Sequence, residues 1–412
     1  MTTRVLAAVI AAFFLVSSAG TAKPARPLRT PAIAAIDAMM RAEIQSGRLS
    51  SAQLAIASPR GVFKKSYGKA TDHTMYELAS LTKPVATTTA IMILVDRGQL
   101  ALRDRVSKYI PEFAQNGKHS VTVEDLLLHT GGMPQSFPES DYTADRATIL
   151  QHAYARKLDF KPGTGFSYSN LGFIILAEVV ARVSGMPFEK FCTRNIFRPL
   201  GMDDSFFDTT LDGAHRAALA PQLPGQTEAG LRKAFGTVPG VNGHAGMLST
   251  AGDLLKFVDS LLDAQRGRIS FQPKPILSQR AVAALIAPHY VGDMEYRGLG
   301  WDLASGFSRN GGDLMPRGSF GHTGSSGTSL WMDPASGVAV ILVSNNHFTK
   351  DAADTVGLAG RIANIVMAQG LFFDAQRVER EELEFDAAAA RSAAGFPATP
   401  LPPPTPDPAG SP

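Results

Sequence analysis

The spacing of apolar residues divides this chain into two sheet-forming ends and a helical middle. Residues 31–47 carry apolar side chains at helical spacing and stop at a glycine, which predicts an opening helix. Residues 53–57 and 61–67 are short β-rich runs joined by Ser-Pro-Arg-Gly, and they predict a hairpin. The next run, 85–98, predicts an apolar helix that ends at a glycine.

Helical patterns dominate residues 104–240, and strand patterns return after them. The later predicted elements are a capped helix at 254–262, a strand at 298–303, a hairpin of strands 328–333 and 338–345, and a helix at 352–369. The predicted fold class is therefore α/β (α+β), with an antiparallel sheet built from both chain ends and flanked by helices. A helical domain at about 84–240 is inserted into it.

The two chain ends predict segments outside this domain, which itself spans 31–375. Residues 1–22 contain Arg4, an apolar run and then small residues, the pattern of a secretory signal peptide. Export to the periplasm or the medium is therefore expected, with an uncleaved anchor as the alternative, although the run is shorter than the roughly 20 residues that a membrane span needs. Residues 376–412 are predicted to form a disordered tail, because the chain ends in a proline-rich stretch.

Composition excludes several classes of protein. The chain has 412 residues, 44% hydrophobic residues and a formal charge of +3, with no long Lys/Arg run, so it is globular and nucleic-acid binding has no support. Its one cysteine, Cys192, has apolar neighbours at helical spacing and is predicted to be a packing thiol. No ligand cluster such as His-Glu-x-x-His occurs, so no metal or other cofactor is expected.

Candidate chemistry first appears where the hairpin gives way to the apolar helix. Ser80 and Lys83 are one helical turn apart, so the amine can reach the hydroxyl and form a nucleophile with its own base. At a helix N-terminus, backbone N–H groups and the dipole also favour an anion. A second Ser-x-x-Lys, Ser66 to Lys69, lies on a predicted strand, where residues three apart point to opposite faces. Ser80 is therefore the predicted nucleophile.

Lys83 needs neighbours that help it to act as a base, since an ordinary lysine has a pKa near 10.4. Tyr168 and Asn170 supply a phenol and an amide in the segment Phe-Ser-Tyr-Ser-Asn. An alternative is open for both residues, because Asn170 could cap the helix that follows and Tyr168 could simply pack. His244 lies in a glycine-rich stretch and could either border the pocket or be a structural loop histidine.

A third part of the site should be a strand beside Ser80 that offers a backbone N–H and a polar rim for the substrate. Two stretches read His-Thr-Gly. His129-Thr-Gly131 follows a predicted helix and is interpreted as its end, whereas His322-Thr323-Gly324-Ser325 opens the predicted hairpin strand. The stretch that begins at His322 is therefore the predicted third part of the site.

These three motifs, in this order, resemble those of the penicillin-recognising serine hydrolases, the group of class C β-lactamases and their esterase and peptidase relatives. The resemblance spans about 31–370 and includes blocks at 106–113, 126–132, 196–202, 243–250 and 299–301. The resemblance implies that Ser80 is acylated and that Lys83 and Tyr168 share the base and acid roles. It also implies that Asn170 orients the substrate and that the N–H groups of Ser80 and Ser325 form the oxyanion hole. His322, Thr323 and Gly324 would then border the substrate.

The third motif departs from the β-lactamase pattern, because His322 stands where those enzymes carry a lysine. Lysine is a fixed positive charge, whereas histidine is mostly neutral near pH 7. The expected function is thus an exported serine hydrolase of esters or peptide-like amides, including cell-wall peptides: an esterase, D-amino-acid peptidase or DD-carboxypeptidase. The alternatives are a class C-like β-lactamase and a non-catalytic cell-wall peptide-binding protein. An α/β-hydrolase is disfavoured, since no Gly-x-Ser-x-Gly elbow occurs.

Overall fold

The computed structural model describes residues 27–207, 238–265, 275–293, 295–345, 353–370, 375–395 and 398. The predicted signal peptide at 1–22 and the proline-rich end at 399–412 lie outside these residues. Within the described part of the chain no single helix is long and apolar enough to cross a membrane. One bent helix pair, 170–184 with 188–200, reaches that length and apolarity only when both helices are counted together.

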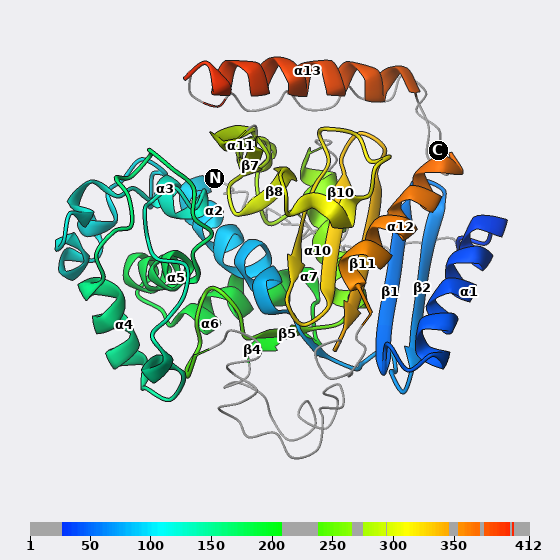
Figure 1. Cartoon of the computed structure of the whole chain (residues 1–412), viewed down its shortest axis with the longest axis horizontal. Coiled ribbons are helices and arrows are strands. Elements are labelled where there is room, and N and C mark those ends of the chain that lie inside the picture. The colour runs from blue at the N-terminus through cyan, green and yellow to red at the C-terminus, as the bar shows by residue number, and fades with distance from the viewer. Residues whose placement is uncertain are drawn as a thin grey trace, which may run out of the picture.

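An eight-stranded sheet is built from both ends of the chain (Figure 1), in the order β2-β1-β11-β10-β9-β8-β7-β6. All of its pairings are antiparallel, and Ala52 of the first strand lies opposite Ser344 near the end of the last. The fold class and both predicted hairpins are confirmed. The strands are β1 (Ser51–Ser58), β2 (Gly61–Gly68), β6 (His289–Gly292), β7 (Glu295–Gly298), β8 (Trp301–Ala304), β9 (Phe320–Gly324), β10 (Thr328–Asp333) and β11 (Val338–Ser344).

The strand predicted at 298–303 is confirmed for 301–303, which belong to β8, and is wrong for its first part. β7 ends at Gly298 and β8 begins at Trp301, so residues 299–300 form a turn between two strands. Gly300 makes this turn possible with a φ of +70°, a conformation that residues with a Cβ rarely adopt. A Cβ there would also lie 2.1 Å from Thr88 Oγ1, so the turn packs tightly against the segment that carries the predicted nucleophile.

Helices cover both faces of the sheet. On one face α1 (Pro31–Gln45) and α12 (Thr355–Ala368), both predicted, share a core with β1 and β11. On the other face α10 (Ala251–Gln265) and the helical region form the larger core. The larger core continues without interruption from the sheet into the helical region, because apolar residues of both belong to one buried cluster.

The helical region stands to the left of the sheet in Figure 1. A small sheet of β3, β5 and β4 joins its two ends. Cys192 is fully buried, as predicted for a packing thiol. The elements are β3 (Tyr76–Glu77), the 3-10 turn η1 (Ala79–Leu81), the π turn η2 (Lys83–Thr88), α2 (Thr89–Asp96), α3 (Val123–Leu127), α4 (Arg146–Ala155), α5 (Asn170–Ser184), α6 (Phe188–Cys192), α7 (Arg198–Leu200), β4 (Phe206–Phe207), β5 (Met247–Ser249) and α11 (Gln279–Leu285).

The prediction of a disordered tail from 376 onward is wrong for its first part. Residues Ala375–Ala393 form the helix α13, which lies along the upper edge of the molecule in Figure 1. Phe385, Ala388 and Ala389 make a buried stripe at helical spacing, and Ser392 Oγ accepts a hydrogen bond from Tyr290 N–H at 2.8 Å. The many charges of this segment hide that short apolar stripe in the sequence.

Candidate active site

Ser80 and Lys83 meet at the start of the segment that leads into α2. Ser80 lies in the turn η1 and Lys83 opens the π turn η2, so the predicted helix begins with two irregular turns. Lys83 Nζ donates hydrogen bonds to Ser80 Oγ and to the carbonyl of His244, each at 3.0 Å. Lys83 is fully buried, whereas Ser80 is partly exposed. The more accessible residue of this pair is therefore Ser80.

The backbone just before Ser80 is strained. Ala79 has a φ of +46°, which is uncommon for a residue with a Cβ and is typical of functional turns. The Glu77 carboxylate holds the turn, accepting from Ala79 N–H at 2.8 Å and from Gly246 N–H at 2.9 Å. Glu77 was not singled out in the sequence, because its role depends on Gly246, which is distant along the chain.

Burial makes Lys83 suitable as a base. Its pKa lies well below the usual lysine value, chiefly because desolvation disfavours the ammonium form, and the nearby Arg297 cation acts in the same direction. Glu77 and Asp302 oppose this effect. The amine lies over the ring of Tyr168, 4.8 Å from its centre. A lysine in this setting can hold an unprotonated amine at neutral pH.

Tyr168 lies next to both residues, in the segment that leads into α5. Burial raises the pKa of its phenol above the usual value, and hydrogen bonding with the Ser80 side chain opposes this. The phenol is therefore protonated at neutral pH. Ser169 caps α5, accepting from Gly172 N–H at 3.1 Å, so the alternative in which Asn170 caps this helix is wrong. Asn170 is the first helical residue and is partly exposed beside Tyr168.

His129 is a site neighbour that the sequence interpretation missed. It follows the end of α3, as predicted, but its ring stacks on Tyr168 with centroids 4.4 Å apart. Its Nδ1 accepts from Ser169 N–H at 2.9 Å, and burial lowers its pKa well below the usual value. The neutral ring thus carries its proton on Nε2 and fixes the position of the phenol. Nothing in the segment itself marks His129 as more than a helix end.

The third motif lies beside the Ser80 turn, as predicted. A Cβ on Gly324 would lie 2.2 Å from the carbonyl oxygen of Leu78, so β9 approaches this turn as closely as backbones allow. Thr328 Oγ1 donates to the same carbonyl at 3.0 Å. Thr323 is partly buried at the end of β9, and Ser325 is exposed in the turn that follows.

His322 is 3% exposed, so its side chain is buried and does not form an open rim. Its Nδ1 donates to the carbonyl of Thr323 at 2.6 Å, and its ring centre lies 6.1 Å from that of Tyr168. Burial lowers the pKa of His322 to about 4, so the ring is neutral at pH 7. His244 borders the site through its carbonyl, while its ring packs on Phe137 at 5.1 Å.

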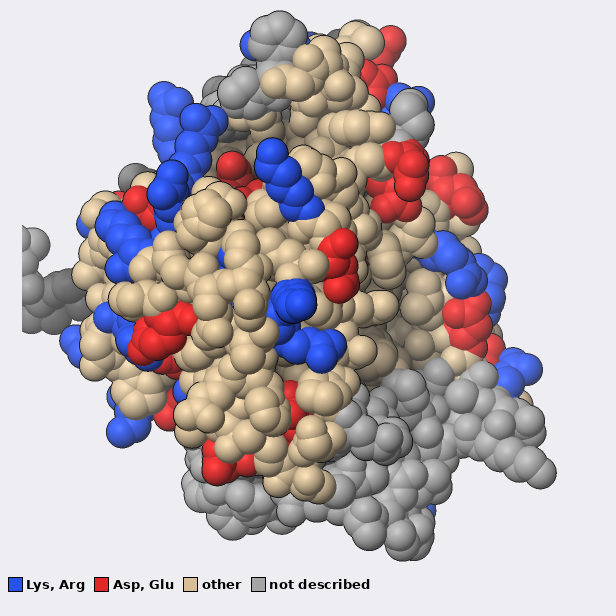
Figure 2. All heavy atoms as spheres, turned by 60° about the vertical axis from the view of Figure 1, so that its left-hand side comes forward, with Lys and Arg blue, Asp and Glu red and all other residues tan. Residues whose placement is uncertain are grey.

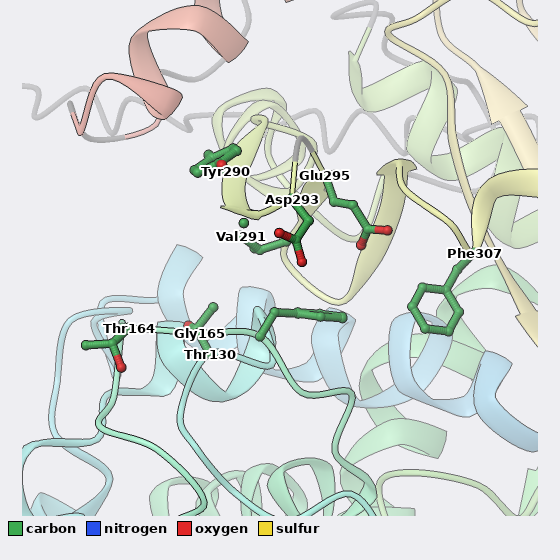
Figure 3. A pocket seen from close by; sticks show the side chains of 11 residues that line it. Thr130, Thr164, Gly165, Tyr290, Val291, Asp293, Glu295 and Phe307 are labelled. Carbon is green, nitrogen blue, oxygen red and sulfur yellow. The ribbon is translucent and has the colours of Figure 1, made fainter.

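A pocket of about 570 Å³ lies between residues 163–166, the β6–β7 hairpin and Phe307 (Figure 3). Phe307 lines it and also stacks on the Tyr168 ring, with centroids 5.6 Å apart. Asp293 and Glu295 give part of its wall an acidic character. Among the described residues no group of three or more His, Cys, Asp and Glu side chains could hold a metal ion. The surface in Figure 2 carries interspersed charges of both signs and no continuous basic face.

A buried lysine amine on a serine hydroxyl, within this α/β fold, defines the class of serine hydrolases with a Ser-Lys pair. The model of the family described as Beta-lactamase matches residues 36–363, and the chain belongs to that family. A protein of Escherichia coli (strain K12), provisionally named a D-alanyl-D-alanine carboxypeptidase, is 30% identical over 310 residues, which cover 67% of this chain and 70% of that protein.

Solved structures share the fold. A penicillin-binding protein homologue from Caulobacter crescentus has a TM-score of 0.68 at 22% identity, covering 84% of this chain and all of that one. A class C β-lactamase has a TM-score of 0.65 at 19% identity, covering 81% and 96%. At these identities the likeness concerns the fold alone.

Proposed function

We propose that this protein is an exported serine hydrolase that cleaves esters or peptide-like amides through an acyl-enzyme on Ser80. The observation that carries the proposal is the 3.0 Å contact between Lys83 Nζ and Ser80 Oγ, made by a lysine that is fully buried. A neutral amine in that place accepts the hydroxyl proton as the oxygen attacks.

The reaction then runs in two steps. Ser80 Oγ bonds to the substrate carbonyl carbon while Lys83 takes the proton, and the oxyanion forms next to the backbone N–H groups of Ser80 and Ser325. The bond to the leaving group breaks as Tyr168, which is protonated, gives its proton to the departing oxygen or nitrogen, and Lys83 restores the phenol proton. Water then attacks the acyl-enzyme by the reverse proton path and releases Ser80.

The substrate class follows from the third motif and from the relatives. His322 is neutral at pH 7, so the motif offers no fixed charge to the carboxylate of a penicillin or cephalosporin. The relative from Escherichia coli is provisionally named a D-alanyl-D-alanine carboxypeptidase, and this name supports a peptide-like amide as the substrate. We therefore place esterase or D-amino-acid peptidase activity ahead of β-lactamase activity.

Fluorophosphonate labelling and a hydrolysis panel test this proposal together. Peptide mapping should place the adduct on Ser80, and the panel should compare p-nitrophenyl butyrate, a D-amino-acid amide, a D-Ala-D-Ala peptide and a chromogenic cephalosporin. Efficient cephalosporin hydrolysis with esters left untouched would show a class C-like β-lactamase instead. Peptide binding without labelling or turnover would show a non-catalytic binding protein.

Export is tested separately, because it depends on residues 1–22. Mass spectrometry of the protein recovered from the periplasm or the medium should show a start near Gly20 or Lys23. A protein that keeps Arg4 would indicate an anchor rather than a cleaved signal peptide.

A further inference from the structure

The pocket between residues 163–166, the β6–β7 hairpin and Phe307 has no part in the reaction described above. Its volume of about 570 Å³ falls within the range of ligand pockets, roughly 300–1,000 Å³. The rings of Phe166, Tyr290 and Phe307 line it, and the last two are 39% and 43% exposed. Exposed rings around a cavity of this size can hold part of a ligand that extends beyond the reacting atoms.

This pocket shares side chains with the surroundings of Tyr168. Phe307 lines the pocket and stacks on the Tyr168 ring, with centroids 5.6 Å apart. The ring of Phe166 lies 6.1 Å from that of His129, and Thr130, which also lines the pocket, directly follows His129 in the chain. A ligand bound to Ser80 can therefore extend along Phe307 into the pocket.

The leaving group is the part of the substrate that lies on this side. In the proposed reaction Tyr168 gives its proton to the departing atom, so the leaving group lies against Tyr168. Phe307 lies against the same ring. The far end of a long leaving group is thus directed to the pocket, whereas the acyl group stays on the other side of the carbonyl carbon that Ser80 attacks.

The charged residues that line the pocket are both acidic. Asp293 is exposed and Glu295 is partly buried, and Figure 3 shows their carboxylates pointing from the β6–β7 hairpin toward residues 163–166. Glu295 Oε1 accepts a hydrogen bond from Gly306 N–H at 2.9 Å, which ties the hairpin to the segment that carries Phe307. Neither carboxylate forms an ion pair within the described part of the chain.

Arg297 does not cancel these two charges. Its guanidinium carbon lies 5.4 Å from the ring centre of Phe166, but the side chain is fully buried and pairs with Asp302. The pair is neutral as a unit, so the pocket keeps the negative charge of Asp293 and Glu295. This charge attracts a cation and repels an anion.

We propose that this pocket binds a cationic end of the leaving group, so that the preferred substrates are esters or amides whose leaving group carries an ammonium group several bonds from the scissile bond. This inference rests on the proposed function, since Tyr168 defines the leaving-group side. A basic side chain or an amino alcohol meets the requirement. A leaving group that ends in a carboxylate is disfavoured.

The test compares two acetate esters that differ only in charge. The leaving group of one has four methylene groups and a terminal trimethylammonium, and its neutral isostere has carbon in place of nitrogen. In the wild type the ratio of kcat/KM for the cationic over the neutral ester should exceed one. Asp293→Asn/Glu295→Gln should lower this ratio roughly 4–25-fold, because an exposed ion pair contributes about two- to fivefold per carboxylate.

Both substitutions keep the shape of the pocket. Asparagine tolerates the φ of +50° at Asp293, and the amide oxygen in Glu295→Gln can still accept from Gly306 N–H. The matched control is Asp72→Asn, an exposed carboxylate paired with Lys64 of β2, at the opposite edge of the sheet from β6. This control should leave the ratio within about twofold of the wild-type value.

A second pair of esters tests the side on which the cation binds. In this pair the acyl group carries the trimethylammonium or its carbon isostere, and ethanol is the leaving group. The double variant should not change the ratio for this pair. A change confined to the acyl pair would overturn the assignment to the leaving group.

Each ratio is measured within one sample, so partial unfolding of a variant does not change it. A wild-type ratio of one or below for the first pair, or a ratio that the double variant leaves unchanged, would overturn the inference while the proposed function stands. If the wild type hydrolyses neither ester, fluorophosphonate labelling of Ser80 decides the proposed function separately. Calorimetric titration with the trimethylammonium alcohol and its neutral isostere then decides the pocket. Tighter binding of the cation that disappears in the double variant supports the inference, and equal binding overturns it.

Discussion

Two segments of this protein carry the same Ser-x-x-Lys spacing and have opposite surroundings. Ser66 lies on β2, where its hydroxyl donates to Asp72 at 2.8 Å, and Lys69 is exposed beyond the strand end. Ser80 lies in a strained turn, and Lys83 is buried and bonded to it. The spacing alone does not make a nucleophile. Burial of the lysine amine activates the serine, because burial lowers the lysine pKa and so favours the neutral amine that can act as a base.

Removing each serine in turn should give the largest difference in activity between the two segments. Ser80→Ala should lower turnover by at least about a thousandfold, because it deletes the nucleophile of a unit that acts together. Ser66→Ala should leave kcat/KM within about twofold, because its hydroxyl contacts only a surface carboxylate. Turnover of p-nitrophenyl butyrate by both variants provides the measurement. A large loss in Ser66→Ala, or full activity in Ser80→Ala, would reverse the assignment.

Removing the lysines should give the next largest difference. Lys83→Ala should lower kcat roughly 100–10,000-fold, the usual contribution of a general base. Lys69→Ala is the matched control and should have no measurable effect, since its side chain is exposed. Single-turnover labelling by a fluorophosphonate measures acylation in both variants. Their circular dichroism spectra show whether each variant is folded, so a loss of acylation can be told apart from a loss of fold. Unchanged labelling of Lys83→Ala would contradict its role as the base.

Sequence patterns predicted the parts of this site that depend on local spacing. Each motif of the site starts or ends a regular element, so its place could be recognised from the sequence. The structure brings these motifs together, namely Ser80, Lys83, Tyr168 and the His322 strand. The sheet built from both chain ends could also be predicted, since its hairpins join short β-rich runs through turns that contain glycine. The resemblance to a known family then placed the motifs in one site.

The residues that tune the site could not be predicted in this way. His129, Glu77 and Arg297 act on Lys83 or Tyr168 through contacts between segments far apart in the chain. The turn at residues 299–300 was included in the predicted strand because it is only two residues long and lies between β-rich residues of β7 and β8. α13 was missed because three small or aromatic side chains carry its burial within a highly charged segment.

Between about pH 6.5 and pH 4, acid should act on the buried site through His322. The pKa of His322 falls from 6.5 to about 4 on folding, so the unfolded chain binds more protons between these values. Stability is therefore lost as pH falls from about 6.5 to about 4, by up to roughly 3 kcal/mol for this residue. Urea unfolding at several pH values should show a shallower decline in His322→Gln than in the wild type.

The control for that experiment is His73→Gln. His73 follows Asp72, the hydrogen-bond partner of Ser66, and it is largely exposed and contacts Asp204 at 2.8 Å. This variant should follow the acid decline of the wild type. An identical decline in His322→Gln would mean that His322 does not lose its proton on folding.

A smaller change should sharpen the role of the third motif. His322→Lys places an ammonium group beside Ser80, which should improve acylation by a β-lactam relative to p-nitrophenyl butyrate by about 1–3 kcal/mol. Intact-protein mass spectrometry with benzylpenicillin, and ester turnover by the same samples, give the ratio. A ratio that stays at the wild-type value would show that charge at position 322 does not select the substrate.

The smallest expected effect concerns stability at the surface segment. Ser66→Ala removes the 2.8 Å hydrogen bond to Asp72, which is exposed and also pairs with Lys64 at 3.0 Å. Because water can replace the hydroxyl, the free energy of unfolding should fall by only about 0.5 kcal/mol or less. Chemical denaturation of Ser66→Ala and Ser66→Thr measures it, since threonine keeps the hydroxyl and suits a strand. A loss of several kcal/mol in Ser66→Ala, restored in Ser66→Thr, would show that this second Ser-x-x-Lys segment has a structural role larger than its exposure implies.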